Sequence, residues 1–189
     1  MRASTRPVFW TAIVVTALTL PAAARGQQPL DPIQVSVRAS EADKLEARAD
    51  AYVESGSWRD LGKAAGLREK AASLRAPADP RGFTSLHMAA LLRHAMKQRP
   101  AAIGLMQRAA EQAMARGDVF NAATAYVNTA FIAVELRDQD LARRSAEKGA
   151  LLLHSPLLTD TQRLMLQRNL AQMQTPERAL AAATVPAAP

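Results

Sequence analysis

The chain has 189 residues, of which 49 % are hydrophobic and only 4 % are aromatic, so one domain with a core of close helix–helix contacts is expected. The formal net charge is +7, but the basic residues are scattered and Arg143-Arg144 is the only doublet, which excludes a basic stripe of the kind that binds nucleic acid. The chain has no Cys, which excludes disulfides, thiolate metal sites and a bacterial lipoprotein anchor.

Residues 1–24 have the pattern of a secretory signal peptide. Arg2 and Arg6 precede a short apolar run from Val8 to Leu20, and three alanines at 22–24 supply the small residues of a cleavage site. We expect cleavage after Ala24, with Gly26 as the alternative, because the run is short for a membrane anchor. The mature protein is therefore predicted to be periplasmic or secreted, with no stable membrane span.

The next segment, residues 25–39, contains two prolines and no helical period, and it is predicted to be an extended linker. Ser40 then begins a helix with Asp43 at the spacing of a capping box, and Gly56 ends it. Three more helices are predicted before the middle of the domain, at Trp58–Leu74, at about Thr84–Lys97, and from Pro100 to Arg116.

The stretch Val119–Val134 contains no charged residue, although Asp118 and Glu135 bracket it. A helix that is apolar or small nearly all the way round is buried by neighbours on several sides. The stretch is also too short and too rich in Asn and Thr for a good membrane span. We therefore predict that it is the central helix of an all-α domain, with Asp118 as its N-cap.

Two helices are predicted to complete the domain. Asp138 opens one that ends near Pro156, and the capping box Thr159–Gln162 opens a seventh that ends at about Gln174. Residues 175–189 fade into Ala, Pro and Thr and are predicted to be disordered. Residues 40–174 should thus form about seven helices, and the short connections predict antiparallel hairpins.

The hairpins also repeat. Small residues recur at Ala49, Ala90 and Ala130, with offsets of 41 and 40 residues, and similar apolar residues flank each of them. Over roughly residues 40–156 this pattern resembles the tetratricopeptide repeat family, which implies a short α-solenoid with the seventh helix as a cap. The pattern departs from the family at Arg93 and Ala133, which replace an aromatic residue, and in its period, which exceeds the usual 34 residues.

The resemblance implies a function as well as a fold. In tetratricopeptide proteins the first helix of each pair lines a concave groove, where an Asn can hold a peptide backbone or carboxylate. It implies a protein or peptide partner and candidate groove residues on two successive repeats, namely Thr124, Asn128, Phe131, His87 and Arg93. The alternative is that Asn128 and Thr129 satisfy neighbouring groups inside the bundle.

Two other functions are suggested by short motifs. Leu158–Gln162 matches the LTxxQ signature of Spy-type periplasmic chaperones, which implies a holdase, although a hydrophobic residue before a capping box gives the same letters. His87 and His94, near four methionines, suggest a Cu(I)-buffering protein. Against that site, the two histidines are two helical turns apart, about 10.5 Å, and methionines commonly fill gaps in cores.

No group of residues suggests catalysis. The sequence lacks a Gly-rich phosphate loop, a zinc motif and a marked pair of carboxylates. We therefore expect a binding protein with no enzymatic activity, no metal site and no cofactor.

Overall fold

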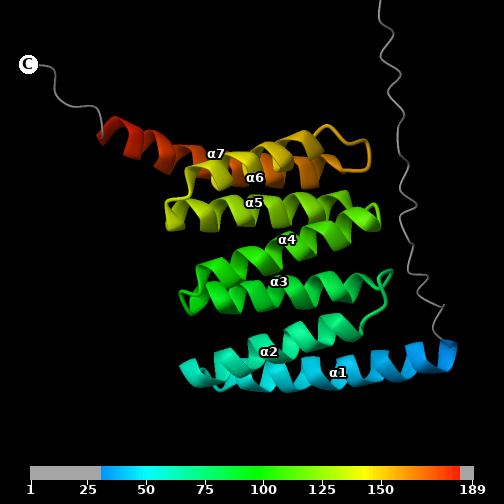
Figure 1. Ribbon diagram of the computed structural model, residues 1–189. Coiled ribbons are helices and arrows are strands. Elements are labelled where there is room, and N and C mark those ends of the chain that lie inside the picture. The colour runs from blue at the N-terminus through cyan, green and yellow to red at the C-terminus, as the bar shows by residue number, and fades with distance from the viewer. Residues whose placement is uncertain (1–30, 184–189) are drawn as a thin grey trace, which may run out of the picture. The chain divides into compact units, whose positions relative to one another are not determined.

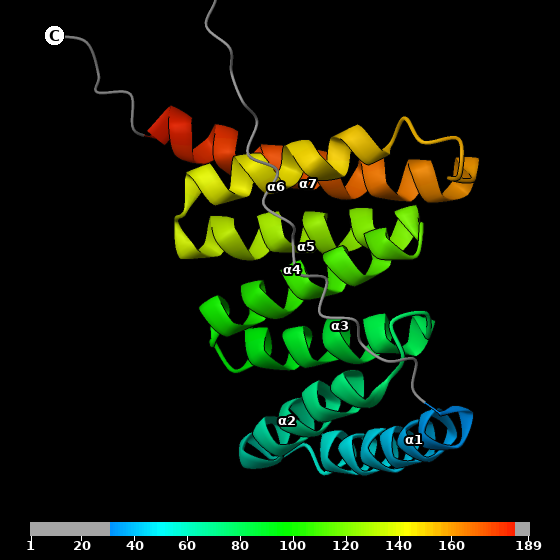
Figure 2. The same ribbon diagram turned by 45° about the vertical axis from the view of Figure 1, so that its right-hand side comes forward.

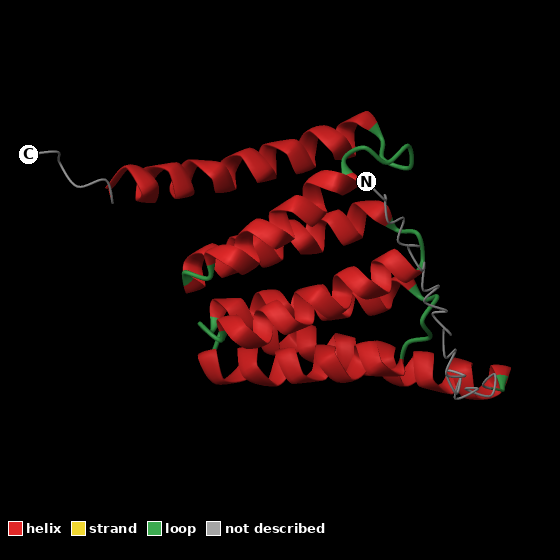
Figure 3. Cartoon of the chain, turned by 45° about the horizontal axis from the view of Figure 1, so that its top comes forward, coloured by secondary structure: helices red, strands yellow, loops and turns green. Residues whose placement is uncertain are grey.

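The structure is a computed structural model that describes residues 31–183, with side-chain surroundings through residue 172. This part of the chain folds into seven helices and no strand (Figure 3). The helices are α1 (Pro32–Glu54), α2 (Trp58–Leu74), α3 (Pro80–Ala95), α4 (Arg99–Ala115), α5 (Val119–Leu136), α6 (Gln139–Leu152) and α7 (Asp160–Ala183). The predicted all-α fold class is confirmed.

The helices stack in chain order. Each helix from α1 to α6 packs against the next, and α7 packs against both α5 and α6. Successive helices run in opposite directions, as Figures 1 and 2 show. In addition α3 contacts α5, and α5 contacts α7, so odd-numbered helices also meet one another. This is the arrangement expected of stacked helical hairpins, while membership of the tetratricopeptide family stays a prediction.

The first helix begins earlier than predicted. α1 starts at Pro32, so the extended linker predicted for residues 25–39 is wrong from residue 32 onward. The Asp31 side chain accepts a hydrogen bond from the Ile33 amide at 2.9 Å, and proline suits the first helical position. Ser40 and Asp43 consequently lie inside the helix, and they do not form the predicted capping box.

The last helix continues past its predicted end. α7 runs to Ala183, so the disordered tail predicted for residues 175–189 is wrong for residues 175–183. The prediction ended the helix at about Gln174 because the following residues fade into Ala, Pro and Thr, but the residues from Ala179 to Ala183 are strong helix formers. The predicted signal peptide and the residues after Ala183 lie outside the described part of the chain.

Two predicted helix starts are confirmed in atomic detail. The Asn121 amide donates to the Asp118 carboxylate at 3.2 Å at the start of α5. At the start of α7 the Gln162 amide donates to the Thr159 hydroxyl at 3.2 Å, and the Thr159 amide donates to the Gln162 side chain at 3.0 Å. The cap at Asp118 is a single one and the cap at Thr159 is reciprocal. Each satisfies otherwise unpaired amides of the first turn.

Helix α5 is central, as predicted. It contacts α3, α4, α6 and α7, and it buries Ala122, Ala123, Ala125, Val127, Thr129, Ala130, Ile132 and Ala133. Among residues 31–183 it is the one helix that is long and apolar enough to cross a membrane, by length and composition. Its contacts with four neighbouring helices account for that apolar composition.

The recurring small residues lie where helices approach closely. Ala49 and Ala90 are fully buried and Ala130 is 1 % exposed, and each belongs to a core cluster between helices. Gly149 plays the same part between α6 and α5, because a Cβ atom there would lie 3.1 Å from the Val127 Cγ2 atom.

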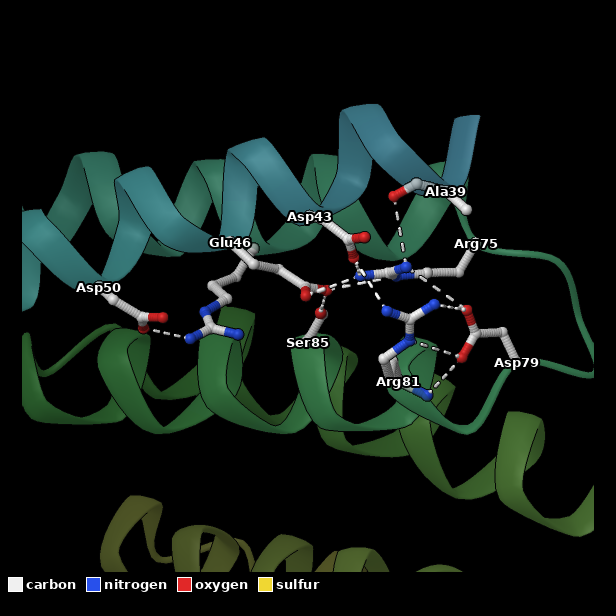
Figure 4. A network of polar contacts seen from close by, with 9 residues as sticks. Ala39, Asp43, Glu46, Asp50, Arg75, Asp79, Arg81 and Ser85 are labelled. Carbon is white, nitrogen blue, oxygen red and sulfur yellow. Dashed lines mark hydrogen bonds and ion pairs between the residues drawn. The ribbon is translucent and has the colours of Figure 1, made fainter. Parts of the chain in front are cut away.

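A cluster of ion pairs around the buried side chain of Arg75 joins the first three helices (Figure 4). The Arg75 side chain, just after α2, is 0 % exposed and donates to Glu46 of α1 at 2.7 Å and also to Asp43. Ser85 of α3 donates to the same Glu46 at 2.5 Å. Burial alone would lower the pKa of Arg75, but the hydrogen bonds that Arg75 donates to Glu46 and Asp43 outweigh it and raise that pKa. We call this set the Arg75 cluster; its remaining members are Asp79 and Arg81.

Candidate functional site on helices α3 and α5

Helical spacing gathers two sets of side chains where α3 meets α5. His87, Leu91 and His94 share one side of α3, and Asn128, Phe131 and Glu135 share one side of α5. We call these six residues the α3–α5 face. Four of them form two polar bridges between the helices.

The first bridge joins Asn128 to His87. The Asn128 Nδ2 atom donates to the His87 Nε2 atom over 2.8 Å. Burial lowers the pKa of His87, which keeps its imidazole neutral and able to accept this hydrogen bond. The ring of Phe83, one turn earlier on α3, stacks on the imidazole with centroids 5.4 Å apart and an interplanar angle of 12°. The imidazole is therefore held from two sides.

The second bridge joins Glu135 to His94 of α3 and Arg99 of α4. Its Oε2 atom lies 2.9 Å from His94 Nε2 and accepts a hydrogen bond from Arg99 Nε at 2.9 Å. The hydrogen bond from His94, with that from Arg99, lowers the pKa of Glu135 against the opposing effect of burial. This bridge ties the end of α3 and the start of α4 to the end of α5.

An apolar spot lies between the two bridges. Leu91 and Phe131 are each about one helical turn from both bridges, and the bridges are two turns apart, about 10.5 Å. Nevertheless Leu91 is 39 % exposed and Phe131 is 48 % exposed. Solvent-facing apolar groups framed by hydrogen-bonding groups resemble the centre of a protein-binding surface.

The five predicted groove residues have different surroundings. His87 and Asn128 contact each other, and Phe131 lies on the same side of α5. The Thr124 hydroxyl, in contrast, donates to the Phe120 carbonyl of its own helix at 2.9 Å. Arg93 donates to Glu69 of α2 at 2.8 Å and to Gln98 at 2.9 Å, so the structure does not bring it to Asn128.

Four residues of this region were not among the predicted groove residues, namely Leu91, His94, Arg99 and Glu135, and His94 was singled out only for the metal alternative. The sequence contained a partial signal for the bridged pairs. The bridged pairs His87–Asn128 and His94–Glu135 are each separated by 41 residues, close to the 40-residue offset of the repeats. The offset of 40 residues pairs His94 with Val134, so the repeat pattern indicates the correct part of α5 but misses Glu135 by one residue.

The motifs behind the alternative functions also have structural partners. In the LTxxQ match, Leu158 is 5 % exposed and packs in the α5–α7 core, while Thr159 and Gln162 cap each other. His87 and His94 bond to different residues of α5. No group of three or more His, Cys, Asp or Glu side chains in the described part of the chain could hold a metal ion.

The neutral state of His87 makes a testable prediction. We expect an NMR titration to give His87 a pKa below the ordinary value of about 6.5. The unfolded chain then binds this proton more readily than the folded one, so His87 lowers stability as the pH falls through about 6.5. A His87→Gln variant, which also assigns the resonance, should lose less stability on acidification; a His87 pKa at or above 6.5 contradicts the prediction.

Comparison of the chain with protein-family models, with curated proteins and with solved structures found no match.

Proposed function

We propose that this protein binds a peptide, or an extended segment of another protein, at the α3–α5 face. The observation that carries the proposal is the solvent exposure of Leu91 and Phe131 between two polar bridges. Covering a large apolar side chain removes it from water, which is the main favourable term in most protein association.

The surroundings of the apolar spot suit a peptide. An apolar side chain of the ligand would cover Leu91 and Phe131. Asn128 has two amide hydrogens and a carbonyl oxygen, and its bond to His87 uses one hydrogen. The other groups of this side chain are positioned to pair with a peptide backbone, as the resemblance to tetratricopeptide proteins implies for a groove Asn.

The proposal includes location and activity. The predicted signal peptide at residues 1–24 makes the partner another periplasmic or secreted protein or peptide. Binding of this kind requires no cofactor. The side chains of the two bridges form hydrogen bonds and do not catalyse a reaction.

Peptide selection followed by substitution tests the proposal. Peptides selected from a random library against the purified protein should bind with an apolar residue at their centre, and Phe131→Ala should weaken them about tenfold or more. Phe131 is half-exposed, so the variant should keep its fold. Leu151→Ala is the matched control, because Leu151 is 71 % exposed but lies on α6, outside the α3–α5 face. Affinity is measured by calorimetry.

Asn128→Asp probes the polar part of the same site. It removes the amide donor, so peptide affinity should fall as well. If the selected peptides bind the Phe131→Ala and Asn128→Asp variants as tightly as they bind the unchanged protein, the binding site lies elsewhere. Suppressed aggregation of an unfolded client, equal in all variants and without any selected peptide, would favour the holdase alternative.

A further inference from the structure

A second candidate site lies on another part of the helical stack. A depression of ≈ 320 Å³ opens between α4 and α6, and α5 lies between these two helices (Figure 1). Its size is at the lower end of the range for small-molecule sites. None of the six residues of the α3–α5 face lines it. The lining residues are Gln107, Glu111, Tyr126, Leu141, Arg144, Ser145 and Lys148.

One side of the depression is basic. Arg144 and Lys148 of α6 are one helical turn apart and line the same space. In the described part of the chain neither forms an ion pair, whereas their neighbour Arg143 pairs with both Asp140 and Glu147. The Lys148 ammonium is held over the Tyr126 ring at 5.3 Å from its centroid, which fixes a positive charge at the pocket.

The opposite side carries a carboxylate. Glu111 of α4 lines the depression, yet it forms no ion pair with Arg144 or Lys148 within residues 31–172. Both α4 and α6 pack against α5, which keeps the two helices apart. Opposite charges thus face one depression without neutralising each other. An anion alone would meet Glu111 at a cost, whereas a ligand with both charges pairs with each side.

Apolar surface completes the lining. Tyr126 and Leu141 are partly buried, pack against the main core and also line the depression. Ser145 is 4 % exposed and stands between the two cationic residues on α6. The pocket therefore combines cations, a carboxylate and an apolar base, all contributed by the neighbouring helices α4, α5 and α6.

We propose that this pocket binds a small zwitterion with an apolar side chain, such as a free α-amino acid. Arg144 and Lys148 take the carboxylate, Glu111 takes the ammonium group, and the side chain rests on Tyr126 and Leu141. Charge-assisted hydrogen bonds at both ends give this class of ligand its preference over a simple anion. The site is separate from the proposed peptide site and does not depend on it.

An NMR titration of the isotope-labelled full chain with L-leucine tests the proposal. Leucine should shift the backbone amide signals of residues 126 and 141–148. Its affinity should fall about tenfold or more in Arg144→Gln and in Glu111→Gln, since each loses a charged partner. Arg143→Gln is the matched control and should bind leucine normally, because Arg143 lies on α6 beside the pocket without lining it.

Two leucine derivatives separate a zwitterion site from a simple anion site. N-acetyl-leucine lacks the ammonium group and leucinamide lacks the carboxylate, so each should bind about tenfold more weakly than leucine. N-acetyl-leucine binding as well as leucine, with no effect of Glu111→Gln, overturns the zwitterion assignment. Absence of leucine binding, or binding that Arg144→Gln leaves unchanged, overturns the site itself. Phe131→Ala should change none of these affinities.

Discussion

Replacing Arg75 with Ala is expected to lower the free energy of unfolding by about 3–5 kcal/mol, the usual cost of removing one partner from a buried ion pair. The Arg75 side chain is 0 % exposed, while Glu46 and Asp79 are each 17 % exposed. Without the guanidinium, these two carboxylates keep their desolvation cost and lose their common partner. Urea denaturation followed by circular dichroism measures the difference.

Arg81→Ala is the control for this prediction. Arg81 pairs with the same Asp43 and Asp79, but its side chain is 53 % exposed, so its loss should cost no more than about 1 kcal/mol. Arg75→Lys should fall between the two, because an ammonium keeps the charge but cannot reproduce the forked contacts with Glu46 and Asp43. A loss of no more than about 1 kcal/mol for Arg75→Ala, as for Arg81→Ala, would show that the buried position of Arg75 contributes little to folding.

The large expected effect follows from the way α1 is attached. This helix buries only Ala42, Leu45 and Ala49, of which one has a large apolar side chain. Burial of a leucine contributes about 1.5–3 kcal/mol, and the two alanines contribute less. Polar contacts from Arg75 and Ser85 to Glu46 therefore carry an unusual share of the docking of α1.

Local signals were sufficient to predict much of the fold. Nearby residues predict the bounds of α2, which are Trp58 and Leu74. The caps at Asp118 and Thr159 follow from residues within one turn of each helix start. The start of α1 was missed for the same local reason. Both Asp31-Pro32 and Ser40 with Asp43 have the composition of a helix start, and composition does not say which one the chain uses.

Contacts between distant residues were harder to predict. Nothing near Arg75 in the sequence indicates that its side chain is buried, because its partners Asp43 and Glu46 are about 30 residues earlier. At the α3–α5 face, spacing placed His87 and His94 on one side of a helix, and both do contact α5. The exposure of Leu91 and Phe131 depends on how far the helices separate, which the pattern does not encode.

Replacing Leu166 with Ala is expected to have the second large effect, a loss of about 2–5 kcal/mol for a buried leucine. Leu166 is 1 % exposed and packs with Val127 and Ala130 of α5 and with Leu158 and Leu170. The substitution leaves a cavity at the contact between α7 and α5. Denaturation in urea should show a lower midpoint, and Leu164→Ala, at a position 49 % exposed, should leave the midpoint nearly unchanged.

Hydrogen exchange distinguishes two ways in which this loss can arise. As the last helix of the described residues, α7 covers with α6 the buried side of α5 formed by Ala123, Val127 and Ala130, which makes α7 the cap of this stack. If the cap and the stack unfold together, Leu166→Ala speeds amide exchange in α5 as much as in α7. If α7 opens alone, exchange rises only in α7, and the urea midpoint of the remaining helices stays near that of the unchanged protein. The first outcome is expected, because Leu166 and Leu170 of α7 share one buried core with Val127 and Ala130 of α5.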